Sequence, residues 1–212
     1  MLRWGIEVDP AGHTTIPALY AVGEAASSGL HGANRIGSNS LLEGLVLGAM
    51  IGEEVSKEAI GASKLPQGSF HRAVRKESRS VHLDLEDVAY SVRSLMGRLL
   101  GVERSGEGLD EAVTRLEGWA RYLFSFEFDS PRAFEVANLV TVARLMAEAA
   151  NARRESRGTH YRTDFPRRDD AAWRVHSRIV QSEREAALTF EPLRSPSPSP
   201  RIGRARRASQ QK

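Results

Sequence analysis

Cysteine is absent from the 212-residue sequence, and no apolar run is long enough to cross a membrane. Without cysteine the chain forms no disulfide, thiolate metal site or cysteine nucleophile, a composition typical of a reducing compartment. The most apolar window, residues 41–55, is short and contains Glu43, Glu53 and Glu54. The chain also does not begin with an apolar run of signal-peptide length. We therefore expect a cytoplasmic protein without a membrane span.

A strong excess of one charge is lacking as well, since 30 basic and 27 acidic residues give a net charge of +3. Much of the basic excess follows the Ser-Pro repeat of residues 195–200, at Arg201, Arg204, Arg206, Arg207 and Lys212. A nucleic-acid partner would require a basic face that also carries aromatic side chains, and we expect none. Residues 191–212 cannot support a core and are predicted to be a disordered tail.

The amino-terminal residues show two short strand patterns. Residues 5–9 and 18–22 are predicted strands, separated by turn-forming residues 10–13. Residues 23–40 are rich in Gly, Ala, Ser and Asn, whose small side chains pack no core. This loop is suited to the close approach of another group to the backbone.

A helix is predicted from Ser40 to about Ala59. Ser40 and Glu43 form a capping-box pattern, in which each side chain accepts a hydrogen bond from a free backbone N–H. Glycines recur every four residues in this helix, at Gly44, Gly48 and Gly52. Each glycine costs about 1 kcal/mol relative to alanine in a helix interior, so the pattern indicates a close neighbour, either another helix or a cofactor.

Three further amphipathic helices are predicted after a loop at residues 63–68. The first has apolar residues at helical spacing at Leu85, Val88, Val92, Leu95, Met96 and Leu99. The second has them at Val113, Leu116, Ala120 and Leu123. The third begins with Ser130 as N-cap and Pro131 at the first helical position, and it stops at Gly158. Its predicted buried residues are Phe134, Ala137, Val140, Leu145 and Ala149. Such helices form a small antiparallel bundle.

The most informative run is LYAVGEAASSGLHGANRIGSNSLLEGLVLG, residues 19–48. A strand, a loop with one acid and one arginine, and a helix amino terminus together favour the binding of negative charge. The run resembles the signature of the fumarate reductase, succinate dehydrogenase and L-aspartate oxidase flavoproteins. In that signature a Gly-Glu pair precedes an HGANR segment and an NSLLE helix start. The resemblance implies FAD as cofactor and a small dicarboxylate as substrate.

The resemblance also implies roles for individual residues. Glu24 is expected to bind hydroxyls of the FAD ribose, and the backbone at Ser40 and Leu41 is expected to face the pyrimidine edge of the flavin. Arg35 is expected to bind a substrate carboxylate, which suits its permanently charged planar guanidinium. The alternative is that Arg35 is an ordinary loop arginine paired with Glu24 or Glu43.

Two other features of the resemblance are interpreted as structural. His31 is expected to support the loop, although it could also line the pocket. Residues 153–170, RRESRGTHYRTDFPRRDD, resemble the ESRG segment of the helical domain in the same superfamily. Their charged side chains are predicted to form an ion-pair network that closes a helix end onto the flavin domain, at Glu155, Arg157, Arg162 and Asp164.

Within the superfamily, three details favour the L-aspartate oxidase branch. Ser38 precedes Asn39-Ser40, residues 41–46 read LLEGLV, and the carboxyl-terminal region is short. This branch implies oxidation of L-aspartate to iminoaspartate in de novo NAD biosynthesis, with quinolinate synthase as the next enzyme. A succinate dehydrogenase or fumarate reductase flavoprotein is the alternative. A noncatalytic helical module is the alternative from another functional class.

The sequence lacks a GxGxxG segment, so the resemblance implies that the ADP-binding unit would precede Met1. The resemblance covers residues 5–185, which correspond to about the last third of such an enzyme. We expect a mainly α, α+β fragment in which residues 1–64 complete an FAD-binding domain, 65–190 form a helical domain and 191–212 a tail. A truncated gene product would explain why the resemblance covers only the last third of such an enzyme. The chain is expected to bind FAD weakly or not at all without an amino-terminal FAD-binding half.

Overall fold

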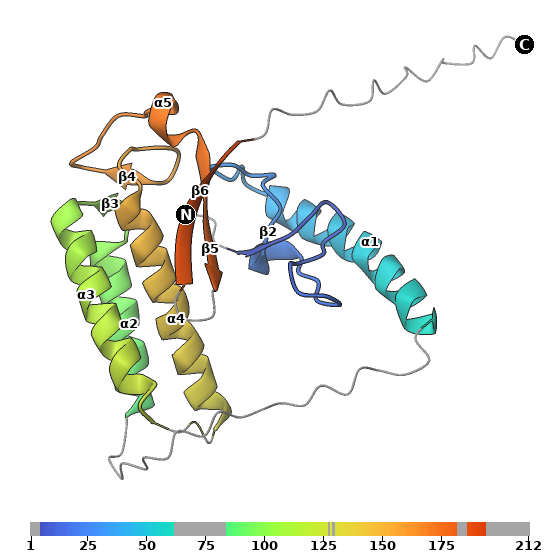
Figure 1. The fold of residues 1–212 in the computed structure, drawn as a ribbon, viewed down its shortest axis with the longest axis horizontal. Helices are drawn as coiled ribbons and strands as arrows, with labels where there is room; N and C mark the ends of the chain where they lie inside the picture. Colours follow the sequence, from blue (N-terminus) through green and yellow to red (C-terminus); the bar gives the residue numbers. More distant parts are fainter. Residues whose placement is uncertain (1–4, 62–83, 127, 129, 182–185, 194–212) are drawn as a thin grey trace, which may run out of the picture. The chain divides into compact units, whose positions relative to one another are not determined.

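The computed structural model describes residues 5–61, 84–126, 128, 130–181 and 186–193. The chain divides into two compact units, Met1–Trp173 and Arg174–Lys212. The larger unit contains an amino-terminal segment with one long helix and a bundle of three helices, and the smaller unit contains a β-hairpin (Figure 1). The mainly helical fold class is confirmed, whereas the predicted domain boundaries remain predictions.

The amino-terminal segment has less regular structure than predicted. Strand β1, Ile6–Glu7, pairs in parallel with β2, Ala26–Ser27, and the short 3-10 helix η1, Gly23–Ala25, immediately precedes β2. The predicted strand at residues 18–22 is wrong, because Ala18 has a left-handed φ of 61° and Tyr20 makes only an isolated bridge. Residues 17 and 18 form a turn, and residues 19–22 have no regular structure apart from the bridge at Tyr20.

Helix α1, Asn39–Gly61, confirms the predicted helix but not its cap. The backbone N–H groups of Leu41 and Leu42 donate to the carbonyl of Ser38, so the helix begins before Ser40. The hydroxyl of Ser40 accepts a hydrogen bond from Arg35, while the carboxylate of Glu43 bonds to His31 and Ser28. The capping-box prediction is wrong because both side chains have partners in the preceding loop.

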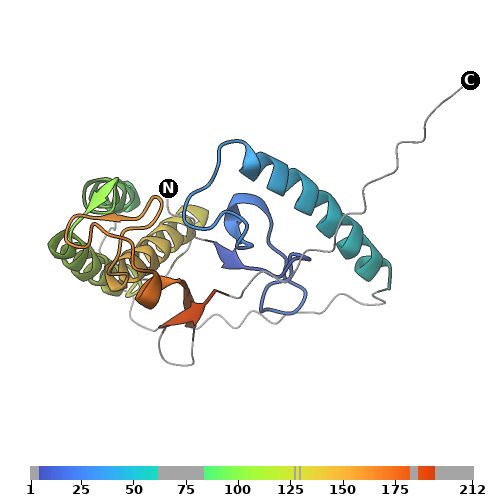
Figure 2. The ribbon, with the colours of Figure 1, turned by 90° about the horizontal axis from the view of Figure 1, so that it is seen from above.

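The helical bundle consists of α2, Leu85–Leu99, α3, Gly106–Leu123, and α4, Pro131–Ala152. Figures 1 and 2 show these helices side by side, with the chain running along them in alternating directions, as predicted. The side chains that fill their shared core are fully buried, among them Val92, Leu109, Leu116, Leu123 and Val140. The apolar periodicity of each helix accounts for this core.

The bundle helices are capped by side chains that match their sequences. Asp84 accepts from the N–H groups of Glu86 and Asp87, and Ser105 accepts from Gly108. Ser130 accepts from Ala133 and Pro131 occupies the first turn of α4, which confirms the predicted start of this helix. Each cap provides an acceptor for a backbone donor that lacks a partner within its helix.

Two expectations for α4 are wrong, and one holds only partly. Phe134 is 53% exposed and stacks edge-on against Phe128, with ring centroids 5.5 Å apart. Leu145 is only half-buried. The helix ends at Ala152 rather than at Gly158, and the side chain of Arg162 in the following loop donates to the carbonyls of Ala150 and Asn151.

Short elements complete the region around the end of the bundle. Strand β3, Glu103–Arg104, follows α2 and pairs in parallel with β4, Tyr161–Arg162. A single helical turn, α5, Asp170–Trp173, closes the larger unit. The β3–β4 pair thus joins the start of α3 to the loop that follows α4.

The smaller unit contains a hairpin that the sequence interpretation missed. Strand β5, Val175–Gln181, pairs antiparallel with β6, Ala186–Pro192, and Arg178 forms a 2.8 Å ion pair with Glu191. Most of this hairpin lies within residues 65–190, for which a helical domain is predicted. Strand β6 also continues past residue 191, where a tail was expected, while residues 194–212 lie outside the described part of the chain. Across the described residues, no helix has the length and apolar character needed to cross a membrane.

Candidate functional site

Three of the predicted site residues lie together at the amino terminus of α1. The Nη1 atom of Arg35 lies 2.7 Å from Oε1 of Glu24 and 2.9 Å from Oγ of Ser40. The side chain of Glu24 is 76% exposed and that of Arg35 is 34% exposed. The alternative interpretation of Arg35, pairing with Glu24, therefore describes this structure. An exposed ion pair of this kind is weak and can be replaced by ligand contacts.

The surroundings of this cluster are open. Gly23 has a φ of 72°, and a Cβ atom added at Gly23, Gly29 or Gly32 would meet no other atom within 4 Å. The side chain of Leu41 is 81% exposed at the start of α1. A helix amino terminus carries a partial positive charge, and an exposed carboxylate accepts hydrogen bonds from hydroxyl groups. These groups fit one edge of a flavin nucleotide.

The backbone at Leu41 already has a hydrogen bond in this structure. Its N–H donates to the carbonyl of Ser38 at 3.1 Å, within the first turn of α1. Ser38 itself has a left-handed φ of 70°, so the chain turns sharply immediately before the helix. The predicted contacts of Ser40 and Leu41 with the flavin stay predictions.

A buried polar group holds the loop that carries Arg35. The Nε2 atom of His31 lies 2.7 Å from Oε2 of Glu43, and these side chains are 2% and 1% exposed. The hydroxyl of Ser28 donates to the other carboxylate oxygen of Glu43. His31 therefore supports the loop, as expected. The sequence interpretation missed Ser28 and the loop contact of Glu43, because these contacts depend on how the loop folds onto α1.

A second anchor joins the same loop to the segment after α4. The carbonyl of Ala33 accepts from the N–H of Thr159 at 3.1 Å and from its hydroxyl at 3.4 Å. Gly158 has a φ of 59°, and a Cβ atom added there would lie 2.2 Å from the same carbonyl oxygen. Glycine is therefore required at position 158 by both conformation and space.

The predicted ion-pair network is present and has two centres. In the first, the fully buried carboxylate of Glu155 binds Arg153 at 2.5 Å and Arg157 at 2.6 Å, and it accepts from the N–H of Asp169. Burial raises the pKa of Glu155, but hydrogen bonds from Arg157, Asp169 and Arg153 outweigh it, so the pKa is lowered. The carboxylate is thus held in its charged form.

The second centre closes the end of α4. Arg162 pairs with Asp164 at 2.7 Å and donates to the carbonyls of Ala150 and Asn151 at 3.2 and 3.0 Å. His160 is 1% exposed, and its burial lowers the pKa to about 4. Arginines at a helix end complement its partial negative charge, so these contacts have a structural role.

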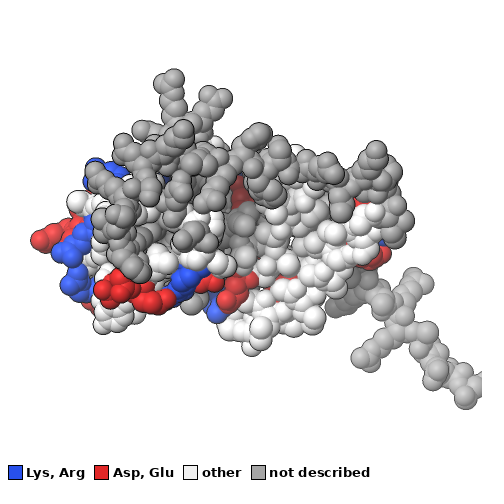
Figure 3. Space-filling view, turned by 90° about the horizontal axis from the view of Figure 1, so that it is seen from below, with Lys and Arg blue, Asp and Glu red and all other residues white. Residues whose placement is uncertain are grey.

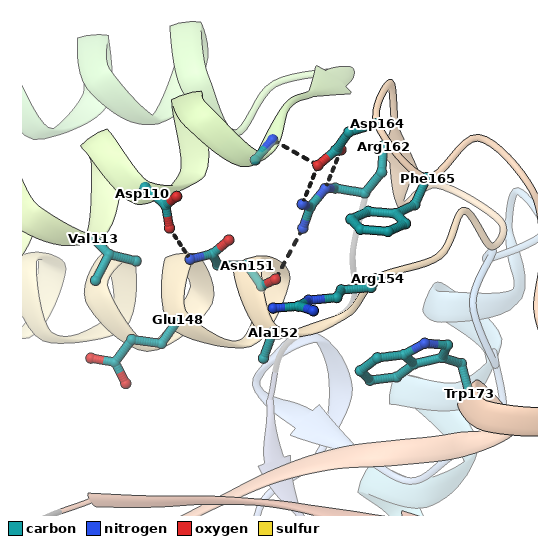
Figure 4. Close-up of a pocket in the computed structure, with 11 residues that line it drawn as sticks. Asp110, Val113, Glu148, Asn151, Ala152, Arg154, Arg162, Asp164, Phe165 and Trp173 are labelled. Atoms are coloured by element: carbon teal, nitrogen blue, oxygen red, sulfur yellow. Dashed lines mark hydrogen bonds and ion pairs between the residues drawn. The ribbon is translucent and has the colours of Figure 1, made fainter.

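A cavity of about 800 Å³ lies beside this second centre (Figure 4). Residues of α3 and α4 line it together with Arg154, Phe165 and Trp173. None of the four predicted site residues lines it. Among the described residues, no group of His, Asp and Glu side chains is arranged to hold a metal ion. The cluster at Arg35 is therefore the candidate site.

The chain is similar to several known proteins. The family model described as "Fumarate reductase flavoprotein C-term" matches residues 89–202, and the model described as "FAD binding domain" matches residues 1–41. The L-aspartate oxidase of Rhodospirillum rubrum is 37% identical and that of Streptomyces coelicolor 36%. The fumarate reductase flavoprotein subunit of Haemophilus influenzae is 34% identical.

The chain covers only part of these relatives. The matches include 92%, 81% and 90% of this chain but 63%, 31% and 35% of the three relatives, in the same order. A solved structure of Mycobacterium smegmatis Sdh1 in complex with UQ1 is 27% identical with a TM-score of 0.74, covering 92% of this chain and 36% of that one. The chain belongs to the fumarate reductase and L-aspartate oxidase family of FAD-dependent flavoprotein oxidoreductases.

Proposed function

We propose that this chain forms the carboxyl-terminal part of an L-aspartate oxidase, which oxidises L-aspartate to iminoaspartate. The cluster of Arg35, Glu24 and Ser40 at the start of α1 carries the proposal, because it combines a cation for a carboxylate with an acceptor for ribose hydroxyls. Iminoaspartate would then be used by quinolinate synthase in de novo NAD biosynthesis.

Each residue of the cluster has one proposed task. Arg35 binds a carboxylate of the substrate through its guanidinium, after leaving the exposed carboxylate of Glu24. Glu24 accepts hydrogen bonds from the ribose of FAD. The backbone of Ser40 and Leu41 places the positive end of α1 at the pyrimidine edge of the flavin, where it stabilises negative charge. The chemistry that FAD supplies when bound is the acceptance of a hydride from the substrate.

A succinate dehydrogenase or fumarate reductase flavoprotein is the second candidate, because a fumarate reductase flavoprotein subunit is similar to this chain, as an L-aspartate oxidase is. Both use a small dicarboxylate, so Arg35 has the same proposed task in either case. The two candidates differ in the substrate Cα, which carries an amino group only in L-aspartate. Ser38 and the LLEGLV sequence of residues 41–46 favour the oxidase.

A titration followed by two-dimensional NMR tests the half-site in the chain itself, because chemical shifts detect binding in the millimolar range. We expect FAD to shift the amide signals of residues 23–28 and 38–42, and L-aspartate to shift those around Arg35. Glu24→Gln should reduce the FAD shifts and Arg35→Gln the L-aspartate shifts. Lys57→Gln, a change in an exposed ion pair elsewhere on α1, is the matched control. Unchanged spectra at millimolar FAD and L-aspartate would show that this half-site does not bind them without the amino-terminal part.

The substrate is tested after adding the amino-terminal part of an L-aspartate oxidase and FAD. Reduction of an artificial electron acceptor should then depend on L-aspartate. Arg35→Gln should abolish it, whereas Lys57→Gln should not. Turnover of succinate but not of L-aspartate would support the second candidate instead.

A further inference from the structure

The two charged groups of the candidate site are bonded to each other. The Nη1 atom of Arg35 lies 2.7 Å from Oε1 of Glu24, and the same atom donates to Oγ of Ser40 at 2.9 Å. The proposed function gives the two charged groups different ligands, a substrate carboxylate for Arg35 and the ribose of FAD for Glu24. Each of these two side chains therefore competes with the ligand of the other.

Few other charged groups lie along this part of the chain. Among residues 10–52, Arg35 is the only Lys or Arg, and Glu24 and Glu43 are the only acids. The carboxylate of Glu43 is 1% exposed and bonds to His31 at 2.7 Å. In Figure 3, Lys, Arg, Asp and Glu side chains gather over the helical bundle, and the surface of the amino-terminal segment is largely without them. Glu24 is therefore the acid that controls the charge around Arg35.

The guanidinium of Arg35 still has donors for a second carboxylate. An arginine side chain has five N–H donors, and the described residues accept hydrogen bonds only from the Nη1 atom of Arg35. A substrate carboxylate can therefore bind on the side of Nε and Nη2. There it meets a cation whose charge Glu24 already neutralises, and it is also repelled by the negative charge of Glu24. Both effects lower the affinity of Arg35 for the carboxylate.

Release of this ion pair requires movement of side chains only. The loop that carries Arg35 is held by the bond between His31 and Glu43 and by the hydrogen bond from the N–H of Thr159 to the carbonyl of Ala33. The side chain of Glu24, in contrast, is 76% exposed. It can therefore turn towards another hydrogen-bond donor while the backbone on both sides of the ion pair keeps its position.

We propose that Glu24 competes with the substrate for Arg35 and that this competition couples the binding of substrate to the binding of FAD. Glu24 accepts hydrogen bonds from the ribose hydroxyls and leaves Arg35, so the full charge of the guanidinium becomes available to a dicarboxylate. FAD and the dicarboxylate then bind with positive coupling, in which each raises the affinity of the other by the same factor. This inference rests on the proposed function.

The exposure of the ion pair sets the size of the coupling. The side chains of Glu24 and Arg35 are 76% and 34% exposed, and pairs with this much contact with water are weak. We therefore expect the competition to change the affinity for a dicarboxylate by a factor of about two to five. Salt screens exposed charges, so the factor should approach one in about 1 M NaCl.

Chemical modification of Arg35 tests the competition without a ligand. Phenylglyoxal reacts with the guanidinium group of arginine, and a bound carboxylate slows this reaction. Mass spectrometry of the digested chain gives the rate at Arg35 alone. We expect Glu24→Gln to raise this rate about two- to fivefold. Glu53→Gln removes an acid of similar exposure, 73%, from α1 and should leave the rate at Arg35 unchanged. An equal rate in the unchanged chain and in Glu24→Gln would overturn the proposal.

Titration of the same three proteins with L-aspartate, followed by amide shifts in NMR spectra, tests the effect on the substrate. Glu24→Gln should lower the dissociation constant about two- to fivefold, although it removes a residue of the candidate site. Adding FAD to the unchanged chain should have the same effect, and adding it to Glu24→Gln should have none. Weaker binding of L-aspartate by Glu24→Gln would overturn the proposal. Faster modification of Arg35 in Glu24→Gln, with L-aspartate shifts that Arg35→Gln does not reduce, would contradict the substrate task of Arg35 in the proposed function but not its competition with Glu24.

Discussion

The helical bundle and the amino-terminal segment of this chain differ in how many apolar side chains they bury. The bundle buries a continuous core of leucine, valine and alanine side chains between α2, α3 and α4. The amino-terminal segment has two strands of two residues each and a long helix that buries only Ile51 among its described apolar side chains. The first region has a continuous buried core, whereas most of the described large apolar side chains of α1 are exposed.

Two ion pairs, one from each region, differ in burial. In the bundle region, the carboxylate of Glu155 is fully buried and bound by Arg153 and Arg157. In the amino-terminal segment, Lys57 pairs with Glu53 where both side chains are largely exposed. Buried pairs fix a structure because removal of one partner leaves an unpaired charge, and exposed pairs contribute little. Substitutions in these two ion pairs should therefore have very different effects.

The largest effect is expected for Glu155→Gln. This change leaves Arg153 and Arg157 without their shared carboxylate, and we expect it to lower the free energy of unfolding by about 3–5 kcal/mol. Urea unfolding followed by circular dichroism measures this loss. Glu53→Gln, which breaks the exposed pair with Lys57, is the matched control and should leave the midpoint unchanged. Equal effects of the two substitutions would contradict the contrast.

Truncation of a core leucine should have the next largest effect. Leu116→Ala removes a fully buried side chain from α3 and should destabilise the bundle by about 2–5 kcal/mol. Leu42→Ala removes a 57% exposed side chain from α1 and should change the stability of the free chain by no more than about 0.5 kcal/mol. The same urea unfolding measurement applies. A large loss for Leu42→Ala would show that α1 is already packed.

The stability of the bundle end should depend on pH through His160. Burial lowers its pKa from 6.5 to about 4, so the unfolded chain binds the proton more readily than the folded chain between these values. Stability is therefore fully present above pH 6.5 and is lost as the pH falls towards 4, by roughly 3 kcal/mol in total. His160→Gln should flatten this slope. An unchanged slope in the variant would assign the acid sensitivity to other groups.

The smallest of these effects is expected at the anchor between the two regions. Gly158→Ala places a Cβ atom against the carbonyl of Ala33 and forces a left-handed residue, at a cost of about 1–3 kcal/mol. We expect faster hydrogen exchange at residues 29–36, while the bundle core exchanges as before. Gly118→Ala is the control, since a Cβ atom added there meets nothing within 4 Å. Protection of residues 29–36 in Gly158→Ala would contradict the role of the anchor.

The sequence predicts the parts of this fold that depend on local order. The three bundle helices and the Ser130–Pro131 start of α4 follow from apolar spacing and capping residues. The missed hairpin has an alternation of apolar and polar residues only in β6, at residues 188–191, next to the Ser-Pro repeat. The capping-box prediction failed for a different reason. The carboxylate of Glu43 forms a hydrogen bond with His31 in the loop, and a local sequence pattern does not predict this contact.

The candidate site could be predicted only in part. A family resemblance brought Glu24, Arg35, Ser40 and Leu41 to notice, and the structure places the first three in contact. Their ligands cannot be read from spacing, because an arginine beside a carboxylate is also an ordinary ion pair. The contact between Ala33 and Thr159 could not be predicted either, since these residues are 126 positions apart in the sequence.

The contact between Ala33 and Thr159 can form only late in the synthesis of the chain. Ala33 and Thr159 are 126 residues apart, so the loop that carries Arg35 leaves the ribosome long before its anchor does. Local helices form as they emerge, whereas a contact over this distance waits for the whole intervening chain. A chain that ends within α4 would lack Thr159, so this anchor of the loop that carries Arg35 would not form.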